Sequence, residues 1–126
     1  MDIGGQITFI YTRDPDASNR FYQDVLNLPL VVTQEGGCRI YRTSASAYLG
    51  VCREREGRVS NQDGLVICFV CQDVEGVHSR LADLGVEIVR PPTHSKAFGV
   101  YSCFFRDPDG HLLEVQRFDD PDWYAG

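Results

Sequence analysis

The chain repeats one pattern of elements, and this internal duplication limits its possible folds more than any single motif does. Two β-rich apolar runs, ITFIY and VICFVC, are each followed by an aspartate, Asp14 and Asp73, and these lie 59 residues apart. Such an aspartate accepts hydrogen bonds from the first turn of a helix. Apolar residues at helical spacing follow, and the helices end at Asn27 and Gly85, which tolerate a left-handed backbone. Asn27 and Gly85 lie 58 residues apart, one fewer than the two aspartates, so one residue has been gained or lost within the helices.

Each repeat continues with an apolar strand and then a hairpin. The second hairpin turns at DPDG, residues 107–110, where proline sets φ and glycine takes the positive φ of the turn. The first turns at residues 43–46. The expected strands are 7–11, 28–32, 38–42, 47–52, 66–71, 86–89, 100–106 and 111–118. Half of this chain buries too little surface to fold alone. We therefore predict an α+β fold in which two βαβββ modules form a curved, eight-stranded, partly open barrel with the helices outside.

The expected organisation is a single domain over residues 1–126. Module one spans roughly 5–56 and module two roughly 64–118. The segment 53–64 is polar and charged, as a linker is. The acidic tail, 119–126, carries two aromatic residues, and we expect it to dock on a neighbouring subunit or to fray.

The charge balance excludes two classes of partner. The chain has 12 Lys+Arg against 18 Asp+Glu, a net charge of −6. A surface of that sign repels phosphate backbones and anionic lipids, so we expect neither nucleic acid nor membrane as a partner. The longest uncharged apolar run, Leu65 to Cys71, is far shorter than the ~20 residues that cross a bilayer. The start does not resemble a signal peptide, so a cytoplasmic location is expected.

The five cysteines indicate free thiols rather than a disulfide framework, because their number is odd and the apolar share of the chain is ordinary. Cys52, Cys68 and Cys103 lie in apolar or aromatic stretches, which predicts buried thiols. Cys68 and Cys71 have the spacing of a redox motif, but a spacing of three on a strand points the thiols to opposite faces. We interpret this pair as two small core residues.

Three stretches carry a resemblance to a known family. SNRFYQDVLNL (18–28), DVEGVHSRLADLGV (73–86) and DPDGHLLEV (107–115) resemble the vicinal oxygen chelate superfamily. That superfamily includes glyoxalase I, extradiol dioxygenases, methylmalonyl-CoA epimerases and bleomycin-resistance proteins. The similarity runs from about Ile7 to Phe118. It implies paired βαβββ modules, a small-molecule cleft inside the curved sheet and a homodimer.

The resemblance also implies where a metal would be held. Metalloenzymes of the superfamily place ligands at the start of the first strand and on the last strand of each module. These positions map to Ile7, Gly50, Val66 and Glu114. A divalent ion needs several N or O donors, and the first three side chains offer none. We therefore expect no metal cofactor; the alternative is one divalent metal ion held by residues not identified here.

The three histidines, His78, His94 and His111, occupy none of the mapped ligand positions. We expect each of them to be solvated or locally hydrogen-bonded.

Strand alternation predicts what lines the cleft. Glu114 is taken to point inward, and pairing across the DPDG turn is expected to set Cys103 opposite Glu114. The internal repeat then places the equivalent residues of module one, Tyr41 among them, on the inner face as well. Arg39 is the expected anchor for a ligand carboxylate or phosphate, unless it simply pairs with Glu114. The candidate ligand-binding residues are Phe9, Tyr11, Arg39, Tyr48, Cys68, Tyr101, Cys103, Phe105 and Glu114, with Glu114 also a weak candidate for a catalytic base.

Three functions remain open. The first is metal-independent binding of an amphipathic or aromatic small molecule. The second is a glyoxalase-like lyase/isomerase or a dioxygenase that uses a divalent metal. The third is a subunit whose sheet edges serve protein association. The segment 91–99 is expected to be a long loop that covers the cleft mouth or lies in solvent.

Overall fold

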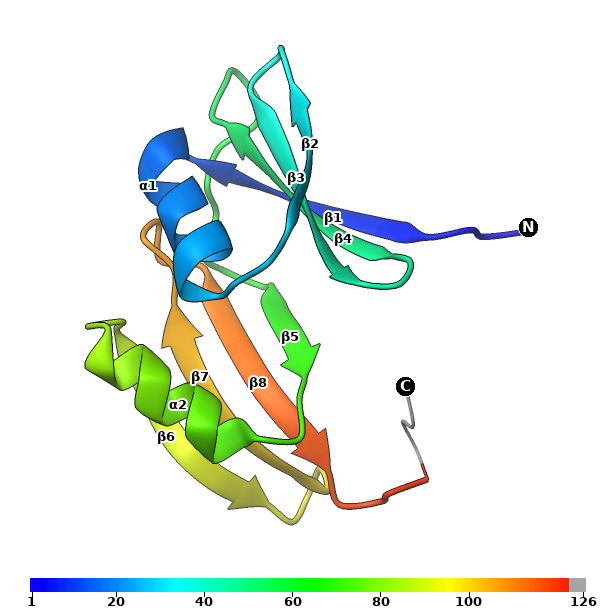
Figure 1. The fold of residues 1–126 in the computed structure, drawn as a ribbon, viewed down its shortest axis with the longest axis vertical. Helices are drawn as coiled ribbons and strands as arrows, with labels where there is room; N and C mark the ends of the chain where they lie inside the picture. The colour runs from blue at the N-terminus through cyan, green and yellow to red at the C-terminus, as the bar shows by residue number, and fades with distance from the viewer. Residues whose placement is uncertain (123–126) are drawn as a thin grey trace. The chain divides into compact units, whose positions relative to one another are not determined.

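Both halves of the chain fold as strand, helix, strand, strand, strand (Figure 1). The computed structural model describes residues 1–122 and divides the chain into two units, one ending at Asn61 and the other beginning at Gln62. We call them module one and module two. The predicted α+β class and the two βαβββ modules are confirmed, and the eight strands are divided into two four-stranded sheets.

The sheets of the two modules have the same topology. In each, the first strand pairs in parallel with the last, and the remaining pairs are antiparallel. Module one contains β1 (Gln6–Thr12), α1 (Pro15–Asn19), the π-helical η1 (Arg20–Val25), β2 (Leu30–Gln34), β3 (Cys38–Ser44) and β4 (Ala47–Arg53), in the sheet order β1-β4-β3-β2. Module two contains β5 (Val66–Val70), α2 (Val74–Asp83), β6 (Ile88–Ser95), β7 (Val100–Arg106) and β8 (Leu112–Phe118), in the order β5-β8-β7-β6.

The helix boundaries follow the signals in the sequence. The Asp14 carboxylate accepts hydrogen bonds from the backbone N–H groups of Asp16 and Ala17, and Asp73 accepts one from Gly76. Asn27 has φ +58° and Gly85 has φ +78°. The first helix is one residue longer than the second between these markers, and it widens into η1. A π-helical turn is the usual way for a helix to hold an extra residue.

The core of each module lies between its helix and its sheet. In module one, Tyr22 of η1 and Tyr41 of β3 are fully buried, and their ring centroids lie 5.8 Å apart. In module two, α2 packs on β6, β7 and β8, and Leu81, Phe105 and Leu113 are buried. We call the opposite face of each sheet, away from its own helix, the inner face. Among the described residues, no helix is long and apolar enough to traverse a lipid bilayer.

The loop predicted at 91–99 is wrong for residues 91–95, because β6 continues to Ser95, and a turn follows at 96–99. Two prolines, Pro91 and Pro92, lie inside this strand. They are tolerated because β6 is at the edge of the sheet and its pairing with β7 shifts between Arg90 and Thr93, where no ladder hydrogen bond is required of them.

The prediction of free cysteines is wrong for Cys38 and Cys52, which form a disulfide. They are direct partners in the β3–β4 ladder, with Cα atoms 4.0 Å apart. Cys68, Cys71 and Cys103 are free. Cys103 is buried as expected, but Cys68 is exposed, so it is not a core residue. The aromatic residues of the tail, at 123 and 124, lie outside the described residues.

Candidate functional site

The inner face of module two depends on the register of the β7–β8 hairpin. Phe104, not Cys103, pairs with Glu114, and Arg106 pairs with Leu112. The predicted pairing is therefore wrong by one residue. Its cause is a connection of five residues, 107–111, instead of four. A one-residue shift sends every side chain of a strand to the other face.

Three predicted cleft residues consequently lie on the helix side of the sheet. The Tyr101 hydroxyl donates a hydrogen bond to Glu75 Oε1 of α2 at 3.0 Å. Cys103 and Phe105 are buried, and burial raises the pKa of the Cys103 thiol. The prediction that these three residues face inward is wrong, since Cys103 and Phe105 belong to the core between sheet and helix and the half-buried Tyr101 contacts α2.

Arg39 and Tyr41 of β3 are also on the helix side. Arg39 donates from Nη1 to the carbonyl oxygen of Pro15 at 2.7 Å and from Nη2 to Asp16 Oδ1 at 3.3 Å. The Tyr41 hydroxyl donates to Asn19 Oδ1 at 2.6 Å. The expected inward orientation of Arg39 is therefore wrong, and its guanidinium joins β3 to the first turn of α1 instead.

The inner face of module two is hollowed over β6, β7 and β8. This module-two hollow has a volume of about 480 Å³, within the range of ligand pockets. Three phenylalanines supply most of its apolar wall. Its lining residues are Arg90, Ser95, Phe98, Val100, Ser102, Phe104, Glu114, Gln116 and Phe118.

Arg90 supplies the positive charge of the module-two hollow, and the sequence analysis did not find it. Its Nη2 donates to Ser102 Oγ at 3.0 Å, and its Cζ lies 4.7 Å from the centroid of the Phe104 ring. The guanidinium is thus held over the Phe104 ring, beside an apolar wall. The expected strand ended at residue 89, so Arg90 was left outside it. Simple alternation from Ile88 would put Arg90 on the helix side; a register shift between these two residues turns Arg90 to the inner face, and no local signal predicts that shift.

Glu114 and Cys68 are neighbours on the inner face, because they are direct partners in the parallel β5–β8 ladder. Gln116 Nε2 donates to Cys68 Sγ at 2.8 Å. Although Cys68 as a whole is exposed, partial desolvation of its thiol, with a smaller contribution from Glu114, raises the pKa of Cys68 to about 11. The Gln116 hydrogen bond acts in the opposite direction. The thiol is therefore protonated at neutral pH and is a poor nucleophile.

The inner face of module one has a second hollow, of about 400 Å³, lined by Phe9, Tyr11, Gln34, Gly36, Cys38, Cys52 and Arg55. We call it the module-one hollow. Phe9 and Tyr11 are therefore on the inner face as predicted, and Tyr48 shares that face through its pairing with Ile7. A Cβ added at Gly50 would overlap the Phe9 ring, so this ring covers the last-strand position of module one.

The mapped metal positions offer one donor side chain. Ile7 and Val66 carry hydrocarbon side chains, and Gly50 is covered by Phe9. Glu114 alone provides oxygen atoms. This donor set does not fit a divalent ion, which takes at least four ligands.

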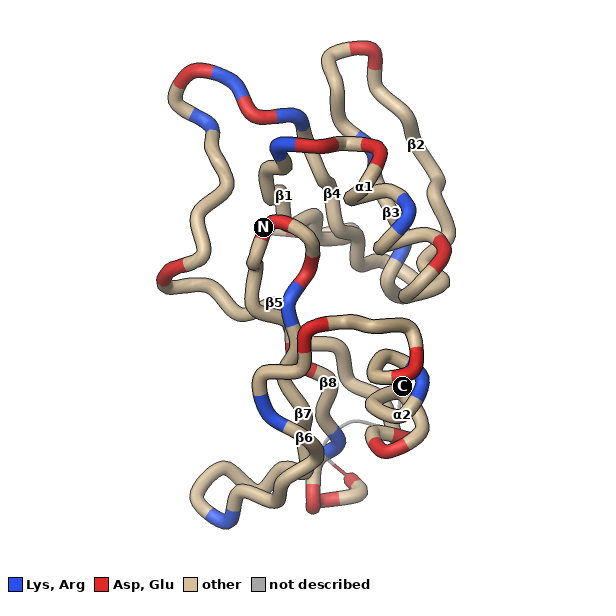
Figure 2. Tube along the Cα trace, turned by 90° about the vertical axis from the view of Figure 1, so that its left-hand side faces the viewer, with Lys and Arg blue, Asp and Glu red and all other residues tan. Residues whose placement is uncertain are grey.

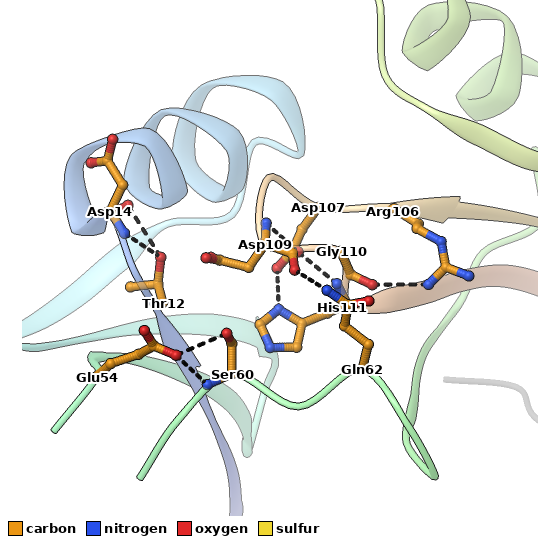
Figure 3. A network of polar contacts seen from close by, with 10 residues as sticks. All are labelled: Thr12, Asp14, Glu54, Ser60, Gln62, Arg106, Asp107, Asp109, Gly110 and His111. Carbon is orange, nitrogen blue, oxygen red and sulfur yellow. Dashed lines mark hydrogen bonds and ion pairs between the residues drawn. The ribbon is translucent and has the colours of Figure 1, made fainter. Parts of the chain in front are cut away.

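A second group of possible ligands is in the β7–β8 turn. Donor atoms of Asp107, Asp109 and His111 lie within 4.8 Å of one another, and all three residues are buried. Asp107 Oδ1 accepts hydrogen bonds from the backbone N–H groups of Asp109 and His111, and Oδ2 is 2.7 Å from His111 Nδ1 (Figure 3). Both Asp107 oxygens thus hold the turn together. This explains the five-residue connection, and it is the chemistry of a turn rather than of an open ion site.

The expectation of local hydrogen bonding is confirmed for two histidines. His111 contacts Asp107, and His94 Nε2 lies 2.8 Å from Asp119 Oδ2. His78 is half-buried on α2.

Comparisons with known proteins agree with this fold. The family model described as Glyoxalase/Bleomycin resistance protein/Dioxygenase superfamily matches residues 5–115. A curated protein of Arabidopsis thaliana, "Glyoxylase I 4", is 24% identical over 119 residues, which covers 87% of this chain and 68% of that protein.

Solved structures give the same result. A lactoylglutathione lyase from Agrobacterium tumefaciens has a TM-score of 0.71 at 24% identity, covering 88% of this chain and 90% of that one. TioX from Micromonospora sp. ML1 has a TM-score of 0.74 at 22% identity, covering 90% and 98%. A glyoxalase-related enzyme from Fulvimarina pelagi has a TM-score of 0.77 at 20% identity, covering 95% and 90%. At these identities the likeness shows the fold alone.

Proposed function

Since this chain belongs to the Glyoxalase/Bleomycin resistance protein/Dioxygenase superfamily, we propose that it is a metal-independent protein that binds an amphipathic or aromatic small molecule in the module-two hollow. The observation that carries this proposal is the composition of the hollow. Three phenylalanines and one valine form its apolar wall, and five polar or charged side chains converge on the same hollow. Small-molecule sites generally combine an apolar wall with convergent polar groups.

The polar groups of the hollow define the chemistry of the ligand. Arg90 is held by Ser102 and by the Phe104 ring, so its remaining N–H groups are pre-oriented for a carboxylate. Glu114 accepts hydrogen bonds from donors on the ligand. The flat ring of Phe104 suits stacking against an aromatic or extended apolar body. We therefore expect a ligand that combines an acidic group with a flat or apolar part.

Metal independence rests on the donor set at the mapped positions. We expect elemental analysis of protein purified without chelator to find Zn, Ni, Mn and Fe well below one equivalent. We also expect these ions to leave the melting temperature unchanged. Stoichiometric metal together with stabilisation would contradict this part of the proposal and favour the alternative with one divalent ion.

Two arginines on opposite faces of the same sheet provide a matched test of the hollow. Arg90 lies over Phe104 on the inner face, and Arg117 lies over Tyr101 on the helix side, with Cζ-to-centroid distances of 4.7 and 4.5 Å. Both contacts are cation–π stacks of similar geometry. Replacing either residue therefore removes a similar structural contact, but only one of the two replacements removes a lining residue of the hollow.

The experiment is a screen of aromatic carboxylates by thermal shift, followed by calorimetry on the hits. We expect Arg90→Ala to weaken binding about tenfold or more, and Arg117→Ala to leave the Kd within about twofold. Equal losses in the two variants would exclude the module-two hollow as the site. A screen with no hit would favour a subunit whose sheet edges serve protein association.

The alternative is a glyoxalase-like lyase/isomerase or a dioxygenase. It is favoured by the names of two similar proteins and by Glu114, the one mapped position with a donor. Turnover in a glyoxalase assay that depends on added Ni, Zn, Mn or Fe and is lost in Glu114→Gln would establish it. We expect no such turnover.

We further propose that the chain is a homodimer, as the family resemblance implies, and that it is cytoplasmic. Light scattering on the purified protein is expected to give twice the chain mass of 14.2 kDa. A monomer at micromolar concentration would contradict this.

A further inference from the structure

The Cys38–Cys52 disulfide does not lie in the core between the sheet and the helix of module one. Both cysteines are on the inner face of module one, and both line the module-one hollow. Their overall exposure is low, 9% for Cys38 and 3% for Cys52, so the hollow is the route to their sulfur atoms. The helix side of the same sheet holds the core residues Tyr41 and Leu49.

The rim of the module-one hollow is open and includes one arginine. A Cβ added at Gly36 would meet no atom within 4 Å, so the β2–β3 turn leaves free space there. Arg55 carries the charge among the described lining residues. It belongs to the segment after β4 in which basic and acidic residues alternate (Figure 2). An arginine at the entrance attracts anions that approach it.

We propose that the Cys38–Cys52 disulfide is a redox site that exchanges with small anionic thiols, which enter through the module-one hollow and are guided by Arg55. Nothing in this proposal depends on the ligand of module two. The chemical class of the reactant is a low-molecular-weight thiol that carries a carboxylate.

The exchange is balanced without any further reactant. The incoming thiolate attacks Cys38 Sγ, the more exposed side of the disulfide, and forms a mixed disulfide. The Cys38–Cys52 bond breaks, and its electron pair stays on Cys52 Sγ, which takes a proton from water. A second thiolate then attacks the sulfur of the bound thiol. The small thiol leaves as its own disulfide, and Cys38 leaves as a thiolate that is protonated, so two thiols supply the two electrons.

The free cysteine Cys68 is exposed and can itself exchange with a disulfide, including the small disulfide that the reaction releases. The experiment therefore uses a Cys68→Ser background. Air-oxidised protein is incubated at mildly alkaline pH and low salt with either 3-mercaptopropionate, which is anionic, or 2-mercaptoethanol, which is neutral. Exchange is quenched with acid and a maleimide, and peptide mass mapping measures the adduct at Cys38.

Arg55 and Arg58 provide the matched pair of charge reversals, since they are backbone partners in one short bridge and only Arg55 lines the hollow. We expect Arg55→Glu to slow exchange with 3-mercaptopropionate about threefold or more, and Arg58→Glu to change it by less than about twofold. The neutral thiol is expected to react at nearly the same rate with both variants. High salt is expected to reduce the difference between them.

Gly36→Phe tests the route independently of charge. We expect it to slow both thiols, because a ring in the open space at Gly36 narrows the entrance. Several outcomes would overturn the proposal: equal effects of the two charge reversals, exchange as slow as global unfolding, or five free thiols in the unfolded air-oxidised wild type. The absence of exchange in folded protein would show an inert structural disulfide.

Discussion

The two modules share a backbone plan but differ at equivalent positions of their inner faces. Cys38 pairs with Cys52 in module one, and Ser102 pairs with Gln116 in module two, 64 residues further along each strand. The disulfide of one module is thus a polar pair in the other. The same ladder therefore supports two different kinds of chemistry, because the scaffold places a residue without determining what it does.

A second pair of equivalent positions, on the last strand of each module, also differs. Gly50 of module one is covered by the Phe9 ring, whereas Glu114 of module two stands beside the small side chain of Cys68. One module has closed the last-strand position with an aromatic ring, and the other has kept a carboxylate there. We attribute ligand binding to module two and redox exchange to module one on this basis.

We expect the two hairpin turns to differ most in what they contribute to the free energy of unfolding. Asp107 is fully buried and holds two backbone N–H groups and the His111 ring, whereas Thr43 is its half-buried equivalent in module one. We expect Asp107→Ala to lower the free energy of unfolding by about 3 kcal/mol or more, since it leaves buried donors without an acceptor. Thr43→Ala is expected to cost below about 0.5 kcal/mol. Urea unfolding measures both, and equal costs would refute the difference between the turns.

The disulfide can be transferred between the modules. Ser102 and Gln116 have the register of Cys38 and Cys52, so Ser102→Cys with Gln116→Cys is expected to form a second disulfide. We expect a stabilisation of up to about 3 kcal/mol that is lost in reductant. Failure to oxidise, shown by a thiol count, would mean that the two ladders are not interchangeable. Cys38→Ser with Cys52→Ser is the reciprocal control and is expected to be destabilising.

The aromatic cover of module one can be tested by a double-mutant cycle. Gly50→Ala is expected to cost about 1 kcal/mol, because its methyl group overlaps the Phe9 ring and that exposed ring must turn aside. The cost is expected to vanish in a Phe9→Ala background. Glu114→Ala, at the equivalent position of module two, serves as the control and is expected to change stability little. A Gly50→Ala cost that persists without the ring would point to the backbone instead.

Tyr41 of module one is equivalent to Phe105 of module two, and the two differ by one hydroxyl. Tyr41→Phe is expected to cost about 1 kcal/mol near neutral pH, because it removes the hydrogen bond to Asn19. Urea unfolding of the variant and the wild type measures this cost. Phe105 shows that the equivalent position of module two is occupied by the same ring without a hydroxyl.

The same tyrosine predicts a pH dependence. Burial raises the pKa of Tyr41 to about 12, although Arg39 opposes this, and an unfolded tyrosine ionises near pH 10. The unfolded state therefore releases a proton that the folded state keeps. Stability is fully present below about pH 10 and is lost as the pH rises towards 12. Titration of wild type against Tyr41→Phe isolates this effect, and parallel curves would contradict it.

Local signals in the sequence were sufficient for the order of the elements and for the ends of the helices. Asp14 and Asp73 start their helices, and Asn27 and Gly85 end them, because capping depends on residues within one turn of the helix. The one-residue difference between the two offsets also anticipated a change within a helix. The family resemblance agrees with the match over residues 5–115.

The faces of the hairpin strands were not predictable in the same way. The side chain of Asp107 holds a connection of five residues, so Cys103 and Glu114 are out of register by one. That single residue moved Tyr101, Cys103 and Phe105 to the helix side. Through the internal repeat, the same error put Arg39 on the wrong face, whereas Arg90 was missed because the expected strand ended at residue 89.

Duplicated local patterns thus determine which elements this chain forms and in what order, since each cap and turn is specified by neighbouring residues. Long-range pairing determines which side chains share a face, because strand period two turns a shift of one residue into a complete inversion. The Cys38–Cys52 disulfide, the strand that continues through two prolines and the arginine over Phe104 all arise at this second level. They depend on contacts between segments that local sequence does not bring together.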